Sequence, residues 1–168
     1  MKKIIKKEEI EKKIRELSDL IKNKYNNQDI VILGVMNGSF FFMRDLMAQL
    51  DIDFKYDFVF CSSYYGKTES SGQVDFIYPN KVDIANKNVI VLEDIIDTGG
   101  TIKVLSQKLR EYRPKAIDFC SLMIRENCTL ELDLFWVGYE IKNEFVVGYG
   151  LDYKGEYRNL EDIYELTV

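Results

Sequence analysis

Short apolar segments that alternate with amphipathic segments constrain the fold of this chain more than any other feature. The run Asp29–Met36 is almost wholly apolar, which is typical of a strand buried on both faces of a sheet. The segment before it has apolar residues at spacings of four, three and four, which predicts a helix with one buried face. Those residues are Ile10, Ile14, Leu17 and Ile21.

The alternation continues toward the C-terminus. Apolar runs predict further strands at residues 54–65, 88–94, 116–124, 134–141 and 145–152, and helices are predicted at 40–50 and after Thr101. This order favours an α/β fold with a mainly parallel sheet flanked by helices. Ligands bind such sheets at the carboxyl ends of the strands. Four polar segments follow predicted strands and become candidates for one site: residues 36–39, 93–101, 124–127 and 151–158.

Length and composition favour a soluble protein with one domain. The chain has 168 residues, of which 46% are hydrophobic and 30% charged. It has no apolar run long enough to span a membrane, and its first residues lack the apolar core of a signal peptide. We therefore expect a cytoplasmic location.

The chain has no histidine, which excludes several kinds of catalytic site. A Ser-His-Asp or Cys-His arrangement cannot form, so a general acid or base must be Asp, Glu, Lys, Tyr or Cys. The three cysteines, Cys61, Cys120 and Cys128, form no CxxC pair and are expected to be small buried residues rather than zinc ligands. The net charge of −5 argues against a broad nucleic-acid surface.

The stretch Val89–Thr101, VIVLEDIIDTGGT, places unusual chemistry at the end of an apolar strand. Glu93, Asp94 and Asp97 repel one another and are costly to desolvate, unless ligand hydroxyl groups or a metal ion relieve the cost. The next four residues, Thr98, Gly99, Gly100 and Thr101, offer hydroxyl groups and close backbone approach at a helix N-terminus. Together they predict a phosphate cradle with a diol-binding edge, which suits a ribose 5-phosphate. An ordinary strand–turn–helix with a capping side chain is the alternative.

This stretch resembles the phosphoribosyl-diphosphate motif of type I phosphoribosyltransferases. The flanking segments resemble the 6-oxopurine branch, the hypoxanthine-guanine phosphoribosyltransferases. The resemblance covers nearly the whole chain and implies one domain over residues 1–168. It also implies a flexible lid at about 62–75 and a small hood formed by the N-terminal and C-terminal segments.

The resemblance assigns residues to the pyrophosphate and the lid. Gly34–Leu46 matches the family's pyrophosphate loop, which implies a cis peptide at Met36–Asn37 and binding of pyrophosphate by the backbone of Asn37, Gly38 and Ser39. Many relatives carry Lys or Arg at the position of Asn37. Ser63 and Tyr64 match the Ser-Tyr pair of the lid.

The segment Phe145–Arg158 matches the family's purine and metal edge. Phe145 would stack on the base, the backbone of Val146 would read the base edge, and Arg158 would face the pyrophosphate. Asp152 would coordinate Mg²⁺, with Glu93 and Asp94 as further candidate ligands. Core packing is the alternative for Phe145.

Arg125 is the main departure from the family, which usually has a lysine there that donates to the purine 6-oxygen. Arginine also donates, but it is longer and planar. Asp97 would be the acid or base at purine N7, and Glu93 and Asp94 would hold the ribose hydroxyls. The implied reaction is Mg²⁺-dependent transfer of 5-phosphoribosyl from phosphoribosyl diphosphate to N9 of hypoxanthine or guanine, giving IMP or GMP and pyrophosphate.

Two alternative functions are compatible with the sequence. A xanthine-preferring or pyrimidine-specific transferase is one, and a regulator that senses phosphoribosyl diphosphate and binds nucleic acid is another. The resemblance suggests a homodimer or homotetramer, and Trp136 could lie in the core or in a subunit interface.

Overall fold

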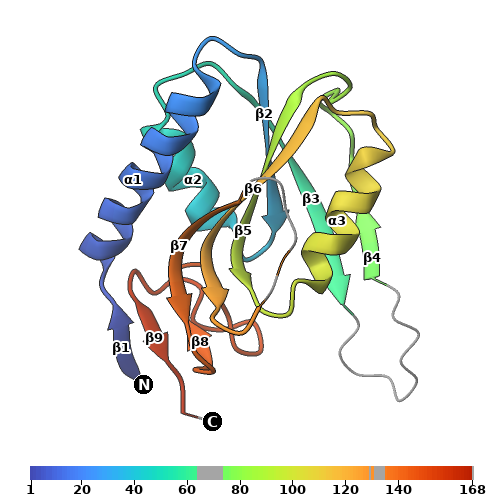
Figure 1. Ribbon diagram of the computed structural model, residues 1–168. Helices are drawn as coiled ribbons and strands as arrows, with labels where there is room; N and C mark the ends of the chain where they lie inside the picture. Colours follow the sequence, from blue (N-terminus) through green and yellow to red (C-terminus); the bar gives the residue numbers. More distant parts are fainter. Residues whose placement is uncertain (64–73, 129, 131–134, 168) are drawn as a thin grey trace.

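A computed structural model describes residues 1–63, 74–128, 130 and 135–167 (Figure 1). A six-stranded sheet forms its centre, in the order β4–β3–β2–β5–β6–β7. Five of these strands run parallel and β4 is antiparallel, so the prediction of an α/β fold with a mainly parallel sheet is confirmed. The strands are β2 (Ile30–Met36), β3 (Lys55–Ser63), β4 (Val74–Ile77), β5 (Asn88–Ile96), β6 (Ala116–Arg125) and β7 (Phe135–Ile141).

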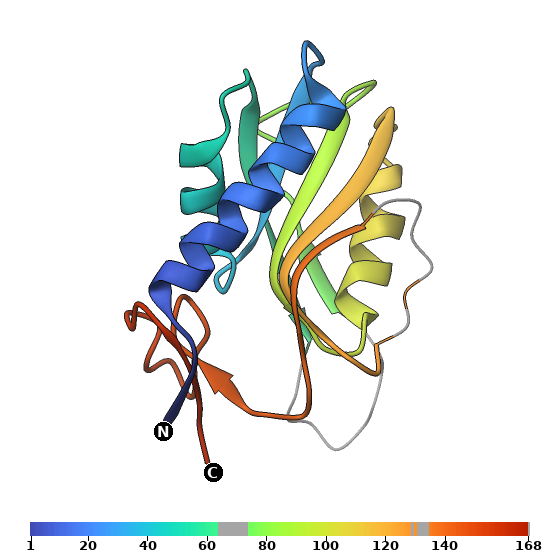
Figure 2. The same cartoon turned by 60° about the vertical axis from the view of Figure 1, so that its left-hand side comes forward.

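Both faces of the sheet are covered, which is why its central strands are mainly apolar on both sides. Helices α1 (Lys7–Tyr25) and α2 (Phe40–Gln49) lie on one face, and α3 (Gly100–Arg110) lies on the other (Figure 2). Ile32 faces the α1–α2 side, whereas its neighbours Val31 and Leu33 face the α3 side. No helix in the described part of the chain is long and apolar enough to cross a membrane.

The four predicted residues of the first helix are all buried, so the periodicity identified its inner face correctly. Glu9 accepts a hydrogen bond from the backbone N–H of Lys6 at 2.8 Å, which satisfies a free donor at the start of α1. Lys22 and Lys24 lie in the last turn, where positive charge suits the helix dipole.

A second, three-stranded antiparallel sheet joins the two ends of the chain (Figure 1). Its order is β1 (Lys2–Ile5), β9 (Ile163–Glu165) and β8 (Val146–Val147). The predicted strand at 145–152 is therefore wrong beyond Val147. Gly148 and Gly150 have φ of +98° and +96°, so the chain turns there instead of continuing extended. The strands β1 and β9 are short and contain charged residues, so the sequence pattern did not predict them.

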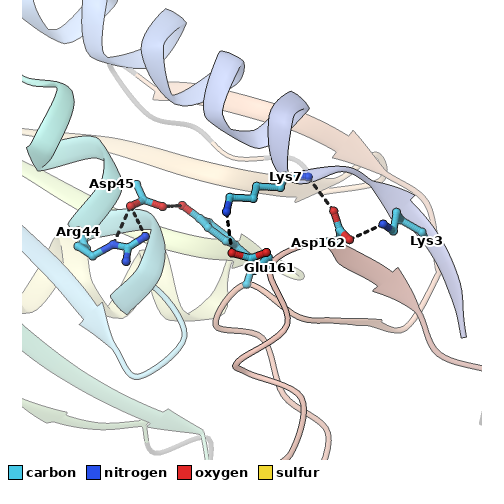
Figure 3. A network of polar contacts seen from close by, with 7 residues as sticks. Lys3, Lys7, Arg44, Asp45, Glu161 and Asp162 are labelled. Atoms are coloured by element: carbon cyan, nitrogen blue, oxygen red, sulfur yellow. Dashed lines mark hydrogen bonds and ion pairs between the residues drawn. The ribbon is translucent and has the colours of Figure 1, made fainter.

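Polar contacts tie the C-terminal segment to the helices (Figure 3). Lys7 donates from its backbone N–H to Asp162 at 2.8 Å, and its ammonium group lies 2.6 Å from Glu161. The Tyr149 hydroxyl donates to Asp45 of α2 at 2.6 Å. The Tyr149 contact holds the turn at Gly148–Gly150 beside α2, and the Lys7 contacts hold residues 161–162 beside the start of α1.

Asp118 is a buried carboxylate near the start of β6, at the opposite end of the strand from Arg125. Asp118 is 3% exposed and accepts hydrogen bonds from the Tyr25 hydroxyl and from the Lys24 ammonium, the latter at 2.5 Å. The ring of Trp136 meets Tyr25 edge-on, with centroids 6.4 Å apart, and packs against the core on the α1 side. This cluster fastens the end of α1 to the sheet.

Removing the buried acceptor should destabilise the protein. In Asp118→Ala, the buried Tyr25 hydroxyl loses its partner, so we expect the free energy of unfolding to fall by about 2 kcal/mol in urea titrations. Asp29→Ala is the matched control, because Asp29 pairs with Lys87 at the surface and its loss should cost less than about 1 kcal/mol. Equal losses in the two variants would contradict this account.

Candidate active site

Three strand ends meet at one edge of the central sheet. β2, β5 and β6 are parallel neighbours, and their arrowheads point the same way in Figure 1. The segments that follow them begin at Asn37, Asp97 and Glu126. The pairing thus collects three of the four candidate segments, as predicted. The fourth segment, residues 151–158, arrives from the small sheet instead.

Glu93 and Asp94 form a buried acid pair at the end of β5. Each is 8% exposed, and the Glu93 Oε2 atom is buried with no hydrogen-bond partner among the described residues. Burial and the neighbouring Asp94 charge raise the pKa of Glu93 well above its usual range. Burial also raises the pKa of Asp94, opposed by hydrogen bonds such as that from the Ile95 N–H at 2.9 Å. Such a pair is suited to ligand hydroxyl groups or to a cation.

The segment after β5 lines a pocket of about 180 Å³. Gly99 has a φ of +80°, and a Cβ atom there would come within 2.4 Å of Leu130, so only glycine fits without a rearrangement. α3 begins at Gly100, which directs the N-terminal end of a helix toward the pocket. The walls combine acidic, hydroxyl and backbone N–H groups, and comprise Glu93, Ile95, Ile96, Asp97, Thr98, Gly99, Gly100, Thr101 and Ile102. A phosphate group fits this chemistry.

The loop between β2 and α2 packs directly against the acid pair. The peptide bond Met36–Asn37 is cis, as the resemblance implied. A Cβ atom on Gly38 would lie 1.9 Å from an Asp94 oxygen, which shows how closely the loop approaches. Asn37 is exposed, whereas Ser39 is fully buried and donates from its hydroxyl to the Val35 carbonyl at 2.7 Å. The Ser39 N–H also points to Val35, so in this structure both of its donors are used within the loop.

The turn after β8 completes the surroundings of this loop. A Cβ atom on Gly150 would lie 2.3 Å from the Gly38 carbonyl oxygen. Arg158 donates to the Gly150 carbonyl and pairs with Asp152 at 2.6 Å. Its positive charge also acts on the Asp94 carboxyl, where it opposes the rise in pKa. The role of Gly150 was not predicted from the sequence, although a Gly-Tyr-Gly run after a strand indicates a tight turn.

Arg125 links the ends of β5 and β6 to the turn before β8. Its Nε donates to Asp97 at 3.2 Å, and its Nη1 donates to the carbonyl oxygens of Lys142 and Glu144, the latter at 2.7 Å. Phe145, the next residue, is 43% exposed and meets the Tyr153 ring edge-on at 5.5 Å. Val146 is buried in β8. An exposed aromatic face thus stands near the Asp97–Arg125 pair.

The predicted lid falls largely outside the described residues. Ser63 is the last residue of β3, and Tyr64 belongs to the segment 64–73 that the structure does not describe. The assignment of this pair to a lid therefore stays a prediction.

The acidic residues fit a cation only in part. Among the described residues, no three His, Cys, Asp or Glu side chains converge on one point, so Asp152 does not join Glu93 and Asp94 in a protein-only metal cluster. Mg²⁺ commonly uses one or two carboxylates and completes its coordination with water and substrate phosphate oxygens. The orphaned Glu93 Oε2 and the partly exposed Asp152 are compatible with that mode.

A larger hollow, of about 610 Å³, lies between α1, α2 and the C-terminal segment. Its walls include two ion pairs, Lys7 with Glu161 and Arg44 with Asp45, shown in Figure 3. These charges neutralise one another, and the hollow shares no residue with the pocket at the end of β5. The chemically distinctive site is therefore the smaller pocket.

Comparison with known proteins identifies the family. Residues 1–154 match the family described as phosphoribosyl transferase domain. The chain is 36% identical over 158 residues to the hypoxanthine-guanine phosphoribosyltransferase of Staphylococcus aureus and 35% identical to that of Staphylococcus epidermidis, covering 94% of this chain and 88% of each relative. A crystal structure of a hypoxanthine-guanine phosphoribosyltransferase from Bacillus anthracis aligns with a TM-score of 0.91 and 38% identity, covering 99% of both chains. The chain belongs to the phosphoribosyltransferase family of enzymes, in its hypoxanthine-guanine branch, and has the type I fold of that family.

Proposed function

We propose that this protein transfers a 5-phosphoribosyl group from phosphoribosyl diphosphate to N9 of hypoxanthine or guanine and releases pyrophosphate. The observation that carries the proposal is the pocket at the end of β5, where a phosphate cradle directly adjoins a buried acid pair. The names of the relatives support a 6-oxopurine as acceptor. The products would be IMP or GMP, in purine salvage in the cytoplasm.

The donor would bind across the three strand ends. The 5-phosphate would accept hydrogen bonds from the residues 98–101, at the N-terminus of α3. The ribose hydroxyls would donate to Glu93 and Asp94, which gives the orphaned Glu93 Oε2 a partner. The pyrophosphate would meet the backbone of Asn37 and Gly38, with Ser39 holding the loop through Val35.

The acceptor would stack on Phe145, with the Val146 backbone at its edge. Asp97 has a largely exposed carboxylate beside Arg125, so it can take the proton from N7 while Arg125 donates to the 6-oxygen. Ser63 and Tyr64 would close over the reaction centre as part of a lid. Bond cleavage at the ribose would precede full bond formation, giving the sugar oxocarbenium character.

Charge on the leaving pyrophosphate must be neutralised for the bond to break. Arg158 supplies one fixed positive charge near Asp94. Bound Mg²⁺ would supply further neutralisation, held by Asp152 and the substrate oxygens with Glu93 and Asp94 close by. Asn37 adds no charge, so this chain depends more on Arg158 than relatives with a basic residue there.

Further assignments complete the proposal. Residues 1–168 would form one domain whose small sheet, β1–β9–β8, serves as the hood, and the protein would assemble as a homodimer or homotetramer. A xanthine preference is the second candidate, since Arg125 replaces the usual lysine at the base. A nucleic-acid-binding regulator is disfavoured by the net charge of −5.

Parallel assays with Mg²⁺, phosphoribosyl diphosphate and five bases test the function. We expect nucleotide formation with hypoxanthine and guanine, because Asp97 and Arg125 present an acceptor and a donor to N7–H and the 6-oxygen. Adenine and uracil should react at least about 100-fold more slowly, since adenine lacks the 6-oxygen that accepts from Arg125 and uracil lacks the ring that carries N7 and N9. Xanthine as the best substrate would select the second candidate, and inactivity with all three 6-oxopurines would refute the proposal.

Asp97→Asn keeps the size of the side chain and removes its ability to take a proton. We expect kcat to fall by about 10² to 10⁴, with little change in the affinity for phosphoribosyl diphosphate. Asp51→Asn, at a carboxylate that is 91% exposed beside Lys22, is the control and should keep normal turnover. Near-normal turnover in Asp97→Asn would show that another group moves the proton.

Gly150→Ala should disturb the pyrophosphate loop. The new methyl group would meet the Gly38 carbonyl, so we expect KM for phosphoribosyl diphosphate to rise about tenfold, equivalent to about 1.4 kcal/mol. Gly138→Ala is the matched control, because its methyl group would also meet a backbone carbonyl, that of Leu122 at 2.6 Å, but within β6 and β7. Gly138→Ala should lose stability but keep the KM of the unaltered protein for phosphoribosyl diphosphate. If the two variants had the same KM for phosphoribosyl diphosphate, the pyrophosphate would bind elsewhere.

A further inference from the structure

The Arg125 guanidinium group is fixed by protein acceptors on two of its three nitrogens. Nε has one N–H, which points to Asp97, and Nη1 has two, which point to the carbonyl oxygens of Lys142 and Glu144. The Arg125 side chain is 15% exposed, and its contact with the Glu144 carbonyl is partly buried, whereas Asp97 and the Lys142 carbonyl accept at exposed positions. Three of the five N–H donors are thereby committed to the protein, and the remaining two are both on Nη2.

These three contacts join segments that are distant in sequence. Asp97 follows β5, Arg125 ends β6, and residues 142–144 lead from β7 to β8. The backbone supports the same junction, because the Glu126 N–H donates to the Ile141 carbonyl at 2.9 Å. Residue 145, which carries the exposed aromatic ring, directly follows the last tethered carbonyl.

A lysine could not make the same set of contacts. Its ammonium group has three donors on a single atom, whereas the guanidinium group spreads its donors over a rigid plane. If the ammonium bound Asp97 and a ligand oxygen, one donor at most would remain for two carbonyl groups. The tether to both carbonyls is thus a property of arginine at this position.

We propose that Arg125 is a positioning residue that locks the Asp97 carboxylate and the turn at residues 142–145 into one rigid unit. This inference rests on the proposed function for its catalytic consequence, because that unit would set the distance between the proton acceptor and the stacked base. The contact with Asp97 orients its carboxylate, and the contacts with the turn orient Phe145. Arg125 thus has a positioning role through these two neighbours, in addition to the direct contact that its remaining Nη2 donors would make with the 6-oxygen.

Arg125→Lys tests the tether while it retains the positive charge. We expect KM for hypoxanthine to rise about tenfold or more, the effect of losing one charge-assisted hydrogen bond, while KM for phosphoribosyl diphosphate stays within about twofold. Amide hydrogen exchange in the peptide that covers residues 142–147 should become about tenfold faster, with no change in α1. Arg15→Lys, at an exposed site on α1, is the control and should change neither quantity.

The hydrogen-exchange measurement tests whether Arg125 restrains residues 142–147, and it does not depend on turnover. Unchanged exchange at 142–147 in Arg125→Lys would overturn the inference, whether or not the protein is active. Faster exchange with an unchanged KM for hypoxanthine would also overturn it, because the turn would then not position the base. If the unaltered protein transfers to no 6-oxopurine, the proposed function fails, and the exchange result alone then supports or refutes the tether.

Discussion

Parallel pairing of β2, β5 and β6 determines where the parts of the proposed site lie. It places three chain reversals at one edge of the sheet, so that the loop at Asn37, the cradle at 98–101 and Arg125 become neighbours. The strands can be mainly apolar on both sides because helices cover both faces of the sheet. Polar groups are consequently concentrated where the strands end, and there they can serve a ligand.

The buried acid pair gives this edge its chemical character. Glu93 and Asp94 continue an apolar strand into a region where carboxylates are costly, and burial raises the pKa of both. Gly38 lies against Asp94, and Gly150 lies against Gly38, so the small sheet reaches the acid pair through two glycines in contact. Arg158 brings positive charge to the same place. The large and the small sheet thus meet at the proposed site of bond cleavage.

The sequence predicted much of this arrangement for identifiable reasons. The strand at residues 88–94 and the cradle at 98–101 follow local rules, since an apolar run, two glycines and a helix start each have their own pattern, and the structure extends that strand to Ile96. The contact between Gly150 and Gly38 has no local pattern, because it depends on how the small sheet packs against α2. The strand predicted at 145–152 ends at Val147 for a related reason: Gly148 and Gly150 adopt positive φ, which an apolar composition does not reveal. The hydrogen bonds of Arg125 likewise depend on the path of residues 142–144.

The end of β5 is the proposed binding site for phosphoribosyl diphosphate. Backbone amide NMR of the protein titrated with phosphoribosyl diphosphate and Mg²⁺, in the absence of a purine, would locate the donor. We expect the largest shift changes on the amides of Thr98–Thr101 and Gly38, with little change in α1. Shift changes confined to the hollow between α1, α2 and the C-terminal segment, or none at saturating ligand, would contradict it.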